Sequence, residues 1–247
     1  MKMKKSSKWF ETWFNSRYYH ILYNHRDEHD AVFFLNHLID YLQPKKEDRI
    51  LDLACGRGRH SINLNKKGFD VVGVDLSLES IEYASTFENE KLIFEVHDMR
   101  NLLCTNSFQY VFNLFTSFGY FERKWENEKV ILNISKTLVP GGKLILDFLN
   151  VASIYRGDHK EDIKNIDGIA FRINKAVNGK FIIKSIDFTD AQTDFHFEEK
   201  LSLLTTEDFE HFFKKAGLEI EAIFGDYSLS PFNVYHSPRL IYCVVKR

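Results

Sequence analysis

Apolar residues along residues 48–150 follow two alternating patterns. Short apolar runs of strand length alternate with segments whose apolar residues recur at helical spacing. The expected strands are 49–54, 70–75, 91–96, 108–115 and 142–149, and the expected helices are 59–67, 78–87 and 125–138. Strands that alternate with helices form a parallel sheet covered on both faces. This pattern therefore predicts an α/β fold with a doubly wound sheet.

Two helical patterns precede this core. Residues 9–26 are rich in aromatic side chains, and residues 28–42 place apolar residues on one face of a helix that stops at Gln43-Pro44. We expect an N-terminal helical cap over residues 9–43. An aromatic surface of this extent normally packs against a ligand site or another part of the protein and is not left exposed to water. We therefore expect the aromatic segment to close over a crevice formed by Asp52, Asp75 and Phe115.

The pattern changes after Asn150. Alternating apolar residues predict strands at 169–176, 180–189 and 193–204, joined at Asn178-Gly179 and at Thr189-Asp190. Asn-Gly between apolar runs is typical of a tight hairpin. We expect an antiparallel β insert over residues 152–204 that forms the opposite wall of the crevice.

The core pattern resumes in the last part of the chain. A helix at 206–216, capped by Thr205 or Thr206 and closed by Gly217, precedes strands at 218–224 and 239–246. A last strand that returns as a hairpin runs antiparallel to its neighbour. We therefore expect a single domain over residues 1–247, with its core in 48–150 and 205–247.

Composition excludes several classes of protein. The 247 residues carry a net charge of −2, so no general basic surface favours nucleic acid. No apolar stretch approaches ~18 residues, and no apolar run follows the basic start, so we expect neither a membrane span nor a signal peptide. The three cysteines lack C-x-x-C spacing, which favours a reducing, cytoplasmic location without structural zinc. We expect no metal site, and Cys55 is expected to be a packing residue.

Candidate chemistry begins at Asp52-Leu53-Ala54-Cys55-Gly56-Arg57-Gly58, an apolar strand that ends in a Gly-x-Gly turn and enters a helix. Glycine lets the backbone approach a ligand because no Cβ intervenes, and N–H groups at the helix start face the same crevice. Asp75 ends the second apolar strand, where a carboxylate accepts hydrogen bonds from a ribose diol. Plain turns and helix caps also use these residues, so each feature alone has a simpler explanation. Together they indicate a nucleotide-type ligand.

Five segments in this order resemble the motifs of class I S-adenosylmethionine-dependent methyltransferases of the small-molecule type. They are the glycine segment, Asp75-Leu76-Ser77, His97-Asp98-Met99, the strand at 108–115 and Leu138-Val139-Pro140-Gly141-Gly142-Lys143-Leu144. The resemblance implies a Rossmann-like, seven-stranded sheet with an antiparallel last strand. It implies S-adenosyl-L-methionine as the cofactor and S-adenosyl-L-homocysteine as its product. The cofactor-binding residues that it implies are Asp52, Ala54, Gly56, Gly58, Asp75, Leu76, Asp98, Met99 and Phe115.

Methyl transfer from such a cofactor is an in-line displacement, for which the protein holds the reactants in place and excludes water. The segments Gly58–Ser61 and Lys66–Val71 also resemble the tellurite-resistance and thiopurine type of methyltransferase, which implies a small-molecule acceptor with an N or O nucleophile. The β insert resembles that of sugar N-methyltransferases, where such strands cover the acceptor or join subunits. We therefore also expect a homodimer through the insert.

The cap contributes further candidates. In enzymes that resemble glycine N-methyltransferase, such a segment folds over the cofactor, and its aromatic and Arg residues hold the methionine end. Arg26 is the candidate for that role, with a surface arginine as the alternative. Tyr19 and His20 are the catalytic candidates, His20 as a proton acceptor, although aromatic stripes of this kind also form cores.

Other functions stay open at this stage. One is a protein or tRNA methyltransferase, and another is a regulatory or scaffold protein that binds S-adenosylmethionine without catalysis. Asp52 and Ser61 disfavour an NAD-dependent enzyme, whose fingerprint places Gly or Ala at position 61. Asn113 invites comparison with the Asn-Pro-Pro-Tyr motif of amino-directed nucleic-acid methyltransferases, but both prolines are absent and Thr116 replaces the tyrosine.

Overall fold

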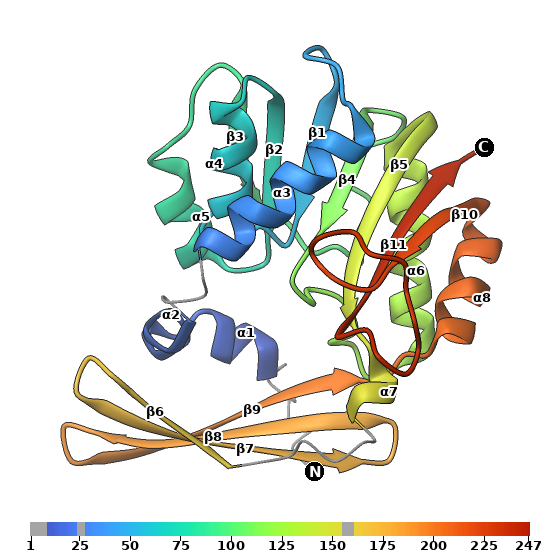
Figure 1. Cartoon of the computed structure of the whole chain (residues 1–247). Helices are drawn as coiled ribbons and strands as arrows, with labels where there is room; N and C mark the ends of the chain where they lie inside the picture. Colours follow the sequence, from blue (N-terminus) through green and yellow to red (C-terminus); the bar gives the residue numbers. More distant parts are fainter. Residues whose placement is uncertain (1–8, 24–27, 155–160) are drawn as a thin grey trace, which may run out of the picture.

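The computed structural model describes residues 9–23, 28–154 and 161–247. Its main sheet has seven strands in the order β10-β11-β5-β4-β1-β2-β3 (Figure 1). The strands are β1 (Arg49–Leu53), β2 (Asp70–Asp75), β3 (Leu92–Val96), β4 (Phe108–Asn113), β5 (Leu138–Leu149), β10 (Leu218–Phe224) and β11 (Arg239–Lys246). Only β11 runs antiparallel to its neighbours, β5 and β10. The predicted doubly wound sheet with an antiparallel last strand is confirmed.

Helices cover both faces of this sheet. One face packs against α3 (Glu28–Leu42), α4 (Arg59–Lys66) and α5 (Leu78–Ser85), and the other against α6 (Lys124–Thr137) and α8 (Thr206–Ala216). Phe34, Leu64 and Ile81 are buried on the first face, and Ile134 and Phe209 on the second. A short helix, α7 (Val151–Ile154), follows β5. Among the described residues, no helix is long and apolar enough to cross a membrane.

Two strand boundaries of the core differ from those expected. β4 ends at Asn113 rather than at 115, because Phe115 and Thr116 adopt left-handed backbone angles that leave the strand. β5 begins at Leu138 rather than at 142. Its predicted turn is a bulge inside the strand, since the partner of Phe108 is Leu138 and the partner of Tyr110 is already Lys143.

The insert is an antiparallel sheet of β6 (Asp162–Ile166), β7 (Ile169–Asn178), β8 (Phe181–Asp190) and β9 (Thr193–Ser202), in that order. The hairpin at Asn178-Gly179 is confirmed, but the next turn is Ala191-Gln192 and not Thr189-Asp190, which still pair with β9. Sequence reasoning missed β6. Its signal was Asp167-Gly168, a dipeptide with two positive φ angles that closes the β6–β7 hairpin.

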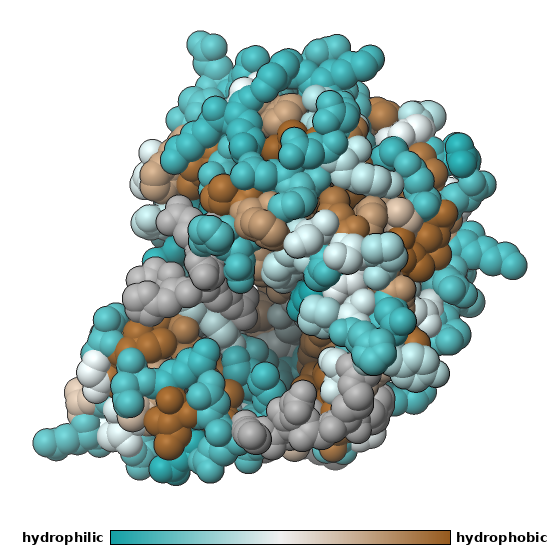
Figure 2. Space-filling view, in the orientation of Figure 1, coloured by the Kyte–Doolittle hydropathy of each residue, from teal (hydrophilic) through white to brown (hydrophobic). Residues whose placement is uncertain are grey.

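The expected N-terminal cap consists of two parts. α1 (Trp9–Phe14) and α2 (Arg17–Tyr23) lie between the insert and the main sheet (Figure 1). They pack on the insert, with the rings of Trp13 and Phe197 and of Tyr18 and Phe188 each 4.6 Å apart. α3 belongs instead to the core, because its Phe34, Leu35 and Leu38 are fully buried in a cluster with residues of the main sheet. Figure 2 shows the surface hollowed between the main sheet and the insert.

Candidate functional site

The glycine loop joins β1 to α4 at the carboxyl edge of the sheet. Ala54, Gly56 and Gly58 all have positive φ angles, of 65°, 56° and 81°. A Cβ on Gly56 would meet no protein atom within 4 Å, and this residue lines a cavity. A Cβ on Gly58 would instead lie 2.6 Å from the ring of Phe94. Gly56 therefore leaves room for a ligand, whereas Gly58 leaves room for the packing of β3 under the loop.

Asp75 ends β2 beside this loop. One carboxylate oxygen accepts the N–H of Gly56 and the other that of Ser77, both at 2.8 Å. The Leu76 N–H also acts on this carboxylate, which as an anion can accept further hydrogen bonds, and the side chain lines the cavity that Gly56 also lines. Burial raises the pKa of the carboxyl group, and the backbone bonds from Ser77 and Gly56 oppose this shift. Asp75 can therefore fix the loop and still accept two hydroxyl protons from a ligand.

Asp52 lies behind the loop and not at its surface. Its side chain is 1% exposed and accepts a 2.6 Å hydrogen bond from the Ser61 hydroxyl at the start of α4. Burial raises the pKa of this carboxyl to about 6, against the opposing effect of the Ser61 hydrogen bonds. The expectation that Asp52 forms the crevice is wrong, because β1 points this side chain toward α4. Through Ser61, Asp52 links β1 to α4, the two elements that flank the glycine loop and hold it in place.

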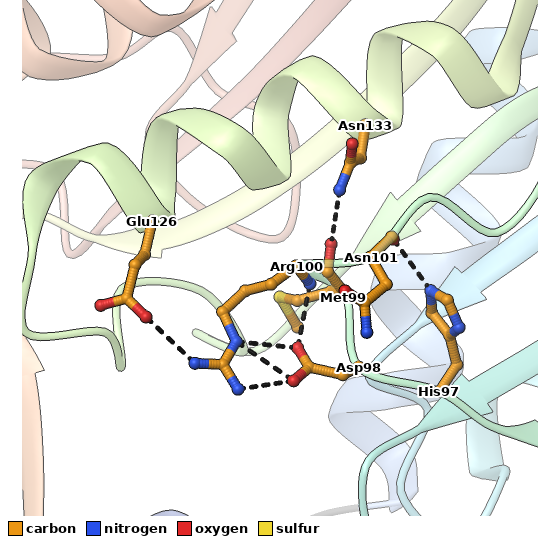
Figure 3. Close-up of polar contacts among 7 residues, drawn as sticks. All are labelled: His97, Asp98, Met99, Arg100, Asn101, Glu126 and Asn133. Atoms are coloured by element: carbon orange, nitrogen blue, oxygen red, sulfur yellow. Dashed lines mark hydrogen bonds and ion pairs between the residues drawn. The ribbon is translucent and has the colours of Figure 1, made fainter.

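The segment after β3 also lines the cavity. Figure 3 shows Asp98 of this segment facing the guanidinium of Arg100. Asp98 and Met99 line the cavity, and Arg100 binds both oxygens of Asp98 through Nε at 3.0 and 3.1 Å. The same guanidinium donates to Glu126 on α6 at 3.0 Å and lies 4.9 Å from the ring centroid of Phe121. Arg100 thus ties this loop to the start of α6 and to Phe121 just before it.

The aromatic segment closes this cavity, which we call the crevice. Phe10 and Phe14 from α1 and Tyr19 from α2 line it together with Asp75 and Phe115. Its volume is about 110 Å³, below the ~300–1,000 Å³ that is common for small-molecule sites. The remaining residues that line it are Leu53, Ala54, Gly56, Leu76, Ser77, Ser80, His97, Asp98, Met99, Ser117, Tyr120 and Phe121. The cap therefore lies in a closed position over the crevice.

A second cavity, of about 410 Å³, adjoins the crevice along the glycine loop. Tyr19 and Gly56 line both, and His20 and His60 line this one. Burial, aided by the charge of Arg57, lowers the pKa of His20 to about 4, so its imidazole is neutral near pH 7. The 3.8 Å approach of His20 to Glu79 is therefore no ion pair at that pH. Arg26 lies outside the described residues.

A third cavity, of about 560 Å³, lies between the carboxyl edge of the sheet and the insert, and we call it the outer cavity. Lys184 of β8 and Glu199 of β9 line it from the insert, and Tyr227 and Arg239 line it from the core. The insert thus forms a wall of the outer cavity. The expectation that the insert forms the opposite wall of the crevice is wrong, because no insert residue lines the crevice among the residues that the structure describes. Sequence reasoning missed these four residues, because no local motif marks them and only the fold brings their segments together.

Phe115 lines all three cavities, and Tyr120 lines the crevice and the outer cavity. The two side chains therefore stand at the junction of the cavities. Asn113 lies elsewhere: it is fully buried and donates to the carbonyl of Leu53 at 2.9 Å. The comparison with the Asn-Pro-Pro-Tyr motif fails for this reason, since Asn113 holds β4 to β1 and lines none of the three cavities described above.

The described residues offer no cluster of His, Cys, Asp and Glu that could hold a metal ion. The chemistry of the lining residues matches a nucleoside cofactor, for which the crevice of about 110 Å³ must widen. Asp75 offers acceptors for a diol, the missing Cβ of Gly56 leaves open space, and apolar side chains such as Leu76 and Met99 line the crevice between them.

Comparisons with known proteins lead to the same class of ligand as the geometry of the crevice does. A family model described as a methyltransferase domain matches residues 23–223. The dTDP-3-amino-3,4,6-trideoxy-alpha-D-glucopyranose N,N-dimethyltransferase of Streptomyces venezuelae is 26% identical over 184 residues, which are 71% of this chain and 77% of that protein.

Two solved structures share the fold. The S-adenosylmethionine-dependent methyltransferase of Clostridium acetobutylicum has a TM-score of 0.77 at 22% identity, covering 93% of this chain and 96% of that one. The amino pentose methyltransferase CalS10 of Micromonospora echinaspora, solved with S-adenosylmethionine bound, has a TM-score of 0.69 at 22% identity, covering 94% and 98%. The chain belongs to the class I S-adenosylmethionine-dependent methyltransferases, as its motifs predicted.

Proposed function

We propose that this methyltransferase moves the methyl group of S-adenosyl-L-methionine to an N or O nucleophile of a small molecule held in the outer cavity. The observation that carries the proposal is the junction at Phe115 and Tyr120, where the crevice and the outer cavity share walls. A cofactor in the crevice and an acceptor in the outer cavity would meet there. Family membership supports the cofactor, and the acceptor side is our inference.

We assign the cofactor-binding roles residue by residue. Asp75 would accept the ribose hydroxyls, and Leu76, Asp98 and Met99 would surround the adenine. Ala54 and Gly56 would lie along the amino-acid part, and Phe115 would stand beside the reacting methyl group. Asp52 and Gly58, which do not line the crevice, would act indirectly by holding the loop through Ser61 and Phe94.

Bound S-adenosyl-L-methionine supplies a methyl group on a positively charged sulfonium. The protein's contribution would be to orient the acceptor and exclude water, which needs no covalent nucleophile. Phe10, Phe14 and Tyr19 would exclude water from the crevice. His20, the candidate proton acceptor, is neutral near pH 7 but lines only the second cavity and neither the crevice nor the outer cavity, and its low pKa makes it a weak base.

A nitrogen nucleophile is the favoured acceptor. The named activities of the Streptomyces relative and of CalS10 concern amino sugars, and the insert covers the outer cavity in this chain. The cavity wall carries charges of both signs, from Lys175, Lys184, Glu199 and Arg239. Such a wall suits a polar acceptor that presents an amine together with other polar groups.

Two measurements test the proposal. Titration calorimetry should show binding of S-adenosyl-L-homocysteine and no binding of NAD. Mass spectrometry of a panel of amino sugars, amino acids and hydroxylated small molecules, incubated with S-adenosyl-L-methionine, should show the mass gain of one methyl group. Cofactor binding with no turnover on any acceptor would favour a regulatory or scaffold role, and methylation of tRNA or protein would favour that alternative.

We also propose a cytoplasmic location and a homodimer formed through the insert. The insert exposes Ile163 on β6 and Val177 on β7 among polar side chains, so a dimer there would be polar in character. Light scattering coupled to size-exclusion chromatography would test the dimer, and a monomer at all concentrations would exclude it.

A further inference from the structure

The backbone at the junction of the cavities is strained. Phe115 and Thr116 have φ angles of 55° and 58°, two consecutive left-handed residues of which neither is glycine. A β-branched residue such as Thr116 rarely adopts this conformation, because its Cβ crowds the backbone. Such outliers persist only where the surroundings hold them.

One buried group holds both residues. Asp147 on β5 is fully buried, and its carboxylate accepts the N–H of Phe115 at 2.7 Å. The backbone carbonyl of the same residue accepts the N–H of Thr116 at 3.1 Å. Asp147 therefore binds both amides of the strained pair.

Arg239 completes the arrangement from β11. Its guanidinium binds Asp147 through Nε at 2.8 Å and through Nη2 at 2.7 Å, and Nη2 also donates to the Thr116 hydroxyl at 2.7 Å. Tyr227 adds a long hydrogen bond to Asp147 at 3.4 Å, and its ring centroid lies 4.9 Å from that of Phe115. The planar fork of arginine presents donors in a fixed geometry to the carboxylate and the hydroxyl, whereas the three donors of a lysine ammonium all lie on one nitrogen and cannot reproduce that geometry.

We propose that Arg239 and Asp147 are positioning residues that hold Phe115 and Thr116 in the left-handed conformation which sets the wall between the cofactor and the acceptor. The inference rests on the proposed function, since it assigns the junction to methyl transfer. The two residues act through Phe115 and Thr116 and need not touch the reacting atoms.

Arg239→Lys tests the proposal because it keeps the charge that compensates buried Asp147. The matched control is Arg49→Lys, since Arg49 binds Asp70 through Nε at 3.0 Å at the opposite end of the sheet. Hydrogen exchange of residues 113–118 should quicken about tenfold or more in Arg239→Lys and stay unchanged in the control. This measurement needs no acceptor, so its outcome is independent of the proposed function. Unchanged exchange in Arg239→Lys would overturn the inference.

Activity on the acceptor found in the panel gives the second readout. In Arg239→Lys, kcat should fall on the order of 100-fold through misplacement at the junction, while S-adenosyl-L-homocysteine binds within about threefold of the wild type. Adding Thr116→Asn should restore part of the rate, because asparagine tolerates the left-handed region better than threonine does. An unchanged kcat, or a double variant no faster than Arg239→Lys, would contradict a positioning role.

Discussion

The Asp75→Ala substitution is the sharpest test of the crevice. The proposed ribose contact consists of two hydrogen bonds from hydroxyl groups to a carboxylate that already holds Gly56 and Ser77. Losing both charge-assisted bonds should cost on the order of 2–3 kcal/mol of binding. That loss corresponds to a dissociation constant about 30- to 150-fold higher.

The substitution also removes the acceptor of two backbone N–H groups, so part of any loss could come from a loosened loop. Asp75→Asn separates the two effects, because its amide oxygen can still hold one backbone N–H while the negative charge is gone. Asp70→Ala is the matched control, since Asp70 begins the same strand in a partly exposed pair with Arg49. It should leave binding unchanged.

Titration calorimetry with S-adenosyl-L-homocysteine measures these affinities, and thermal melts without ligand report on the fold. The pH dependence gives an independent check. Because burial raises the pKa of Asp75, its charge is lost on acidification sooner than that of an exposed aspartate, and affinity should fall with it. Binding of Asp75→Ala within about twofold of the wild type, with an intact fold, would refute the placement of the ribose.

Four further outcomes are expected. Gly56→Val should abolish binding of S-adenosyl-L-homocysteine in calorimetry, because its side chain would enter the crevice; normal binding would make Gly56 a turn residue only. Gly58→Ala should lower the melting temperature, because its Cβ would overlap Phe94; an unchanged melt would show that the ring moves freely. Burial raises the pKa of Asp52 to about 6 from an ordinary 3.8. The free energy of unfolding should therefore fall by roughly 3 kcal/mol as the pH rises from about 4 to above 6, because the buried carboxyl must then ionise. Asp52→Asn should therefore be more stable than the wild type in urea at pH 7 and equal to it below about pH 4, and equal stability at both would contradict the shift. Hydrogen exchange of residues 9–23 should slow when S-adenosyl-L-homocysteine saturates the protein, and unchanged exchange beside a protected glycine loop would show that α1 and α2 are no lid.

Much of the fold was readable from local sequence. The glycine turn, the acid at the end of β2 and the Asn178-Gly179 hairpin are short-range features, in which neighbouring residues fix their own backbone. Their order along the chain gave the family and the cofactor. The crevice residues Gly56, Asp75, Asp98 and Met99 follow from motifs that lie at strand ends, and parallel strands bring those ends to one edge.

Only the tertiary structure decided which residues of those motifs line the crevice and which pack behind it. Gly58 packs against Phe94 and Asp52 binds Ser61, so neither lines the crevice, although both belong to the same motif as Gly56. The sequence motif indicates that Asp52 is buried and that Gly58 allows an unusual backbone conformation. It does not indicate which distant side chain will fill the space beside either residue.

The outer cavity shows the same limit more strongly. Asp147 and Arg239 are 92 positions apart, and Lys184 and Glu199 come from an insert whose place over the sheet no local signal specifies. Hydrophobic periodicity determines which face of an element is buried. It does not determine which elements meet across a cavity, because that depends on the packing of the whole chain.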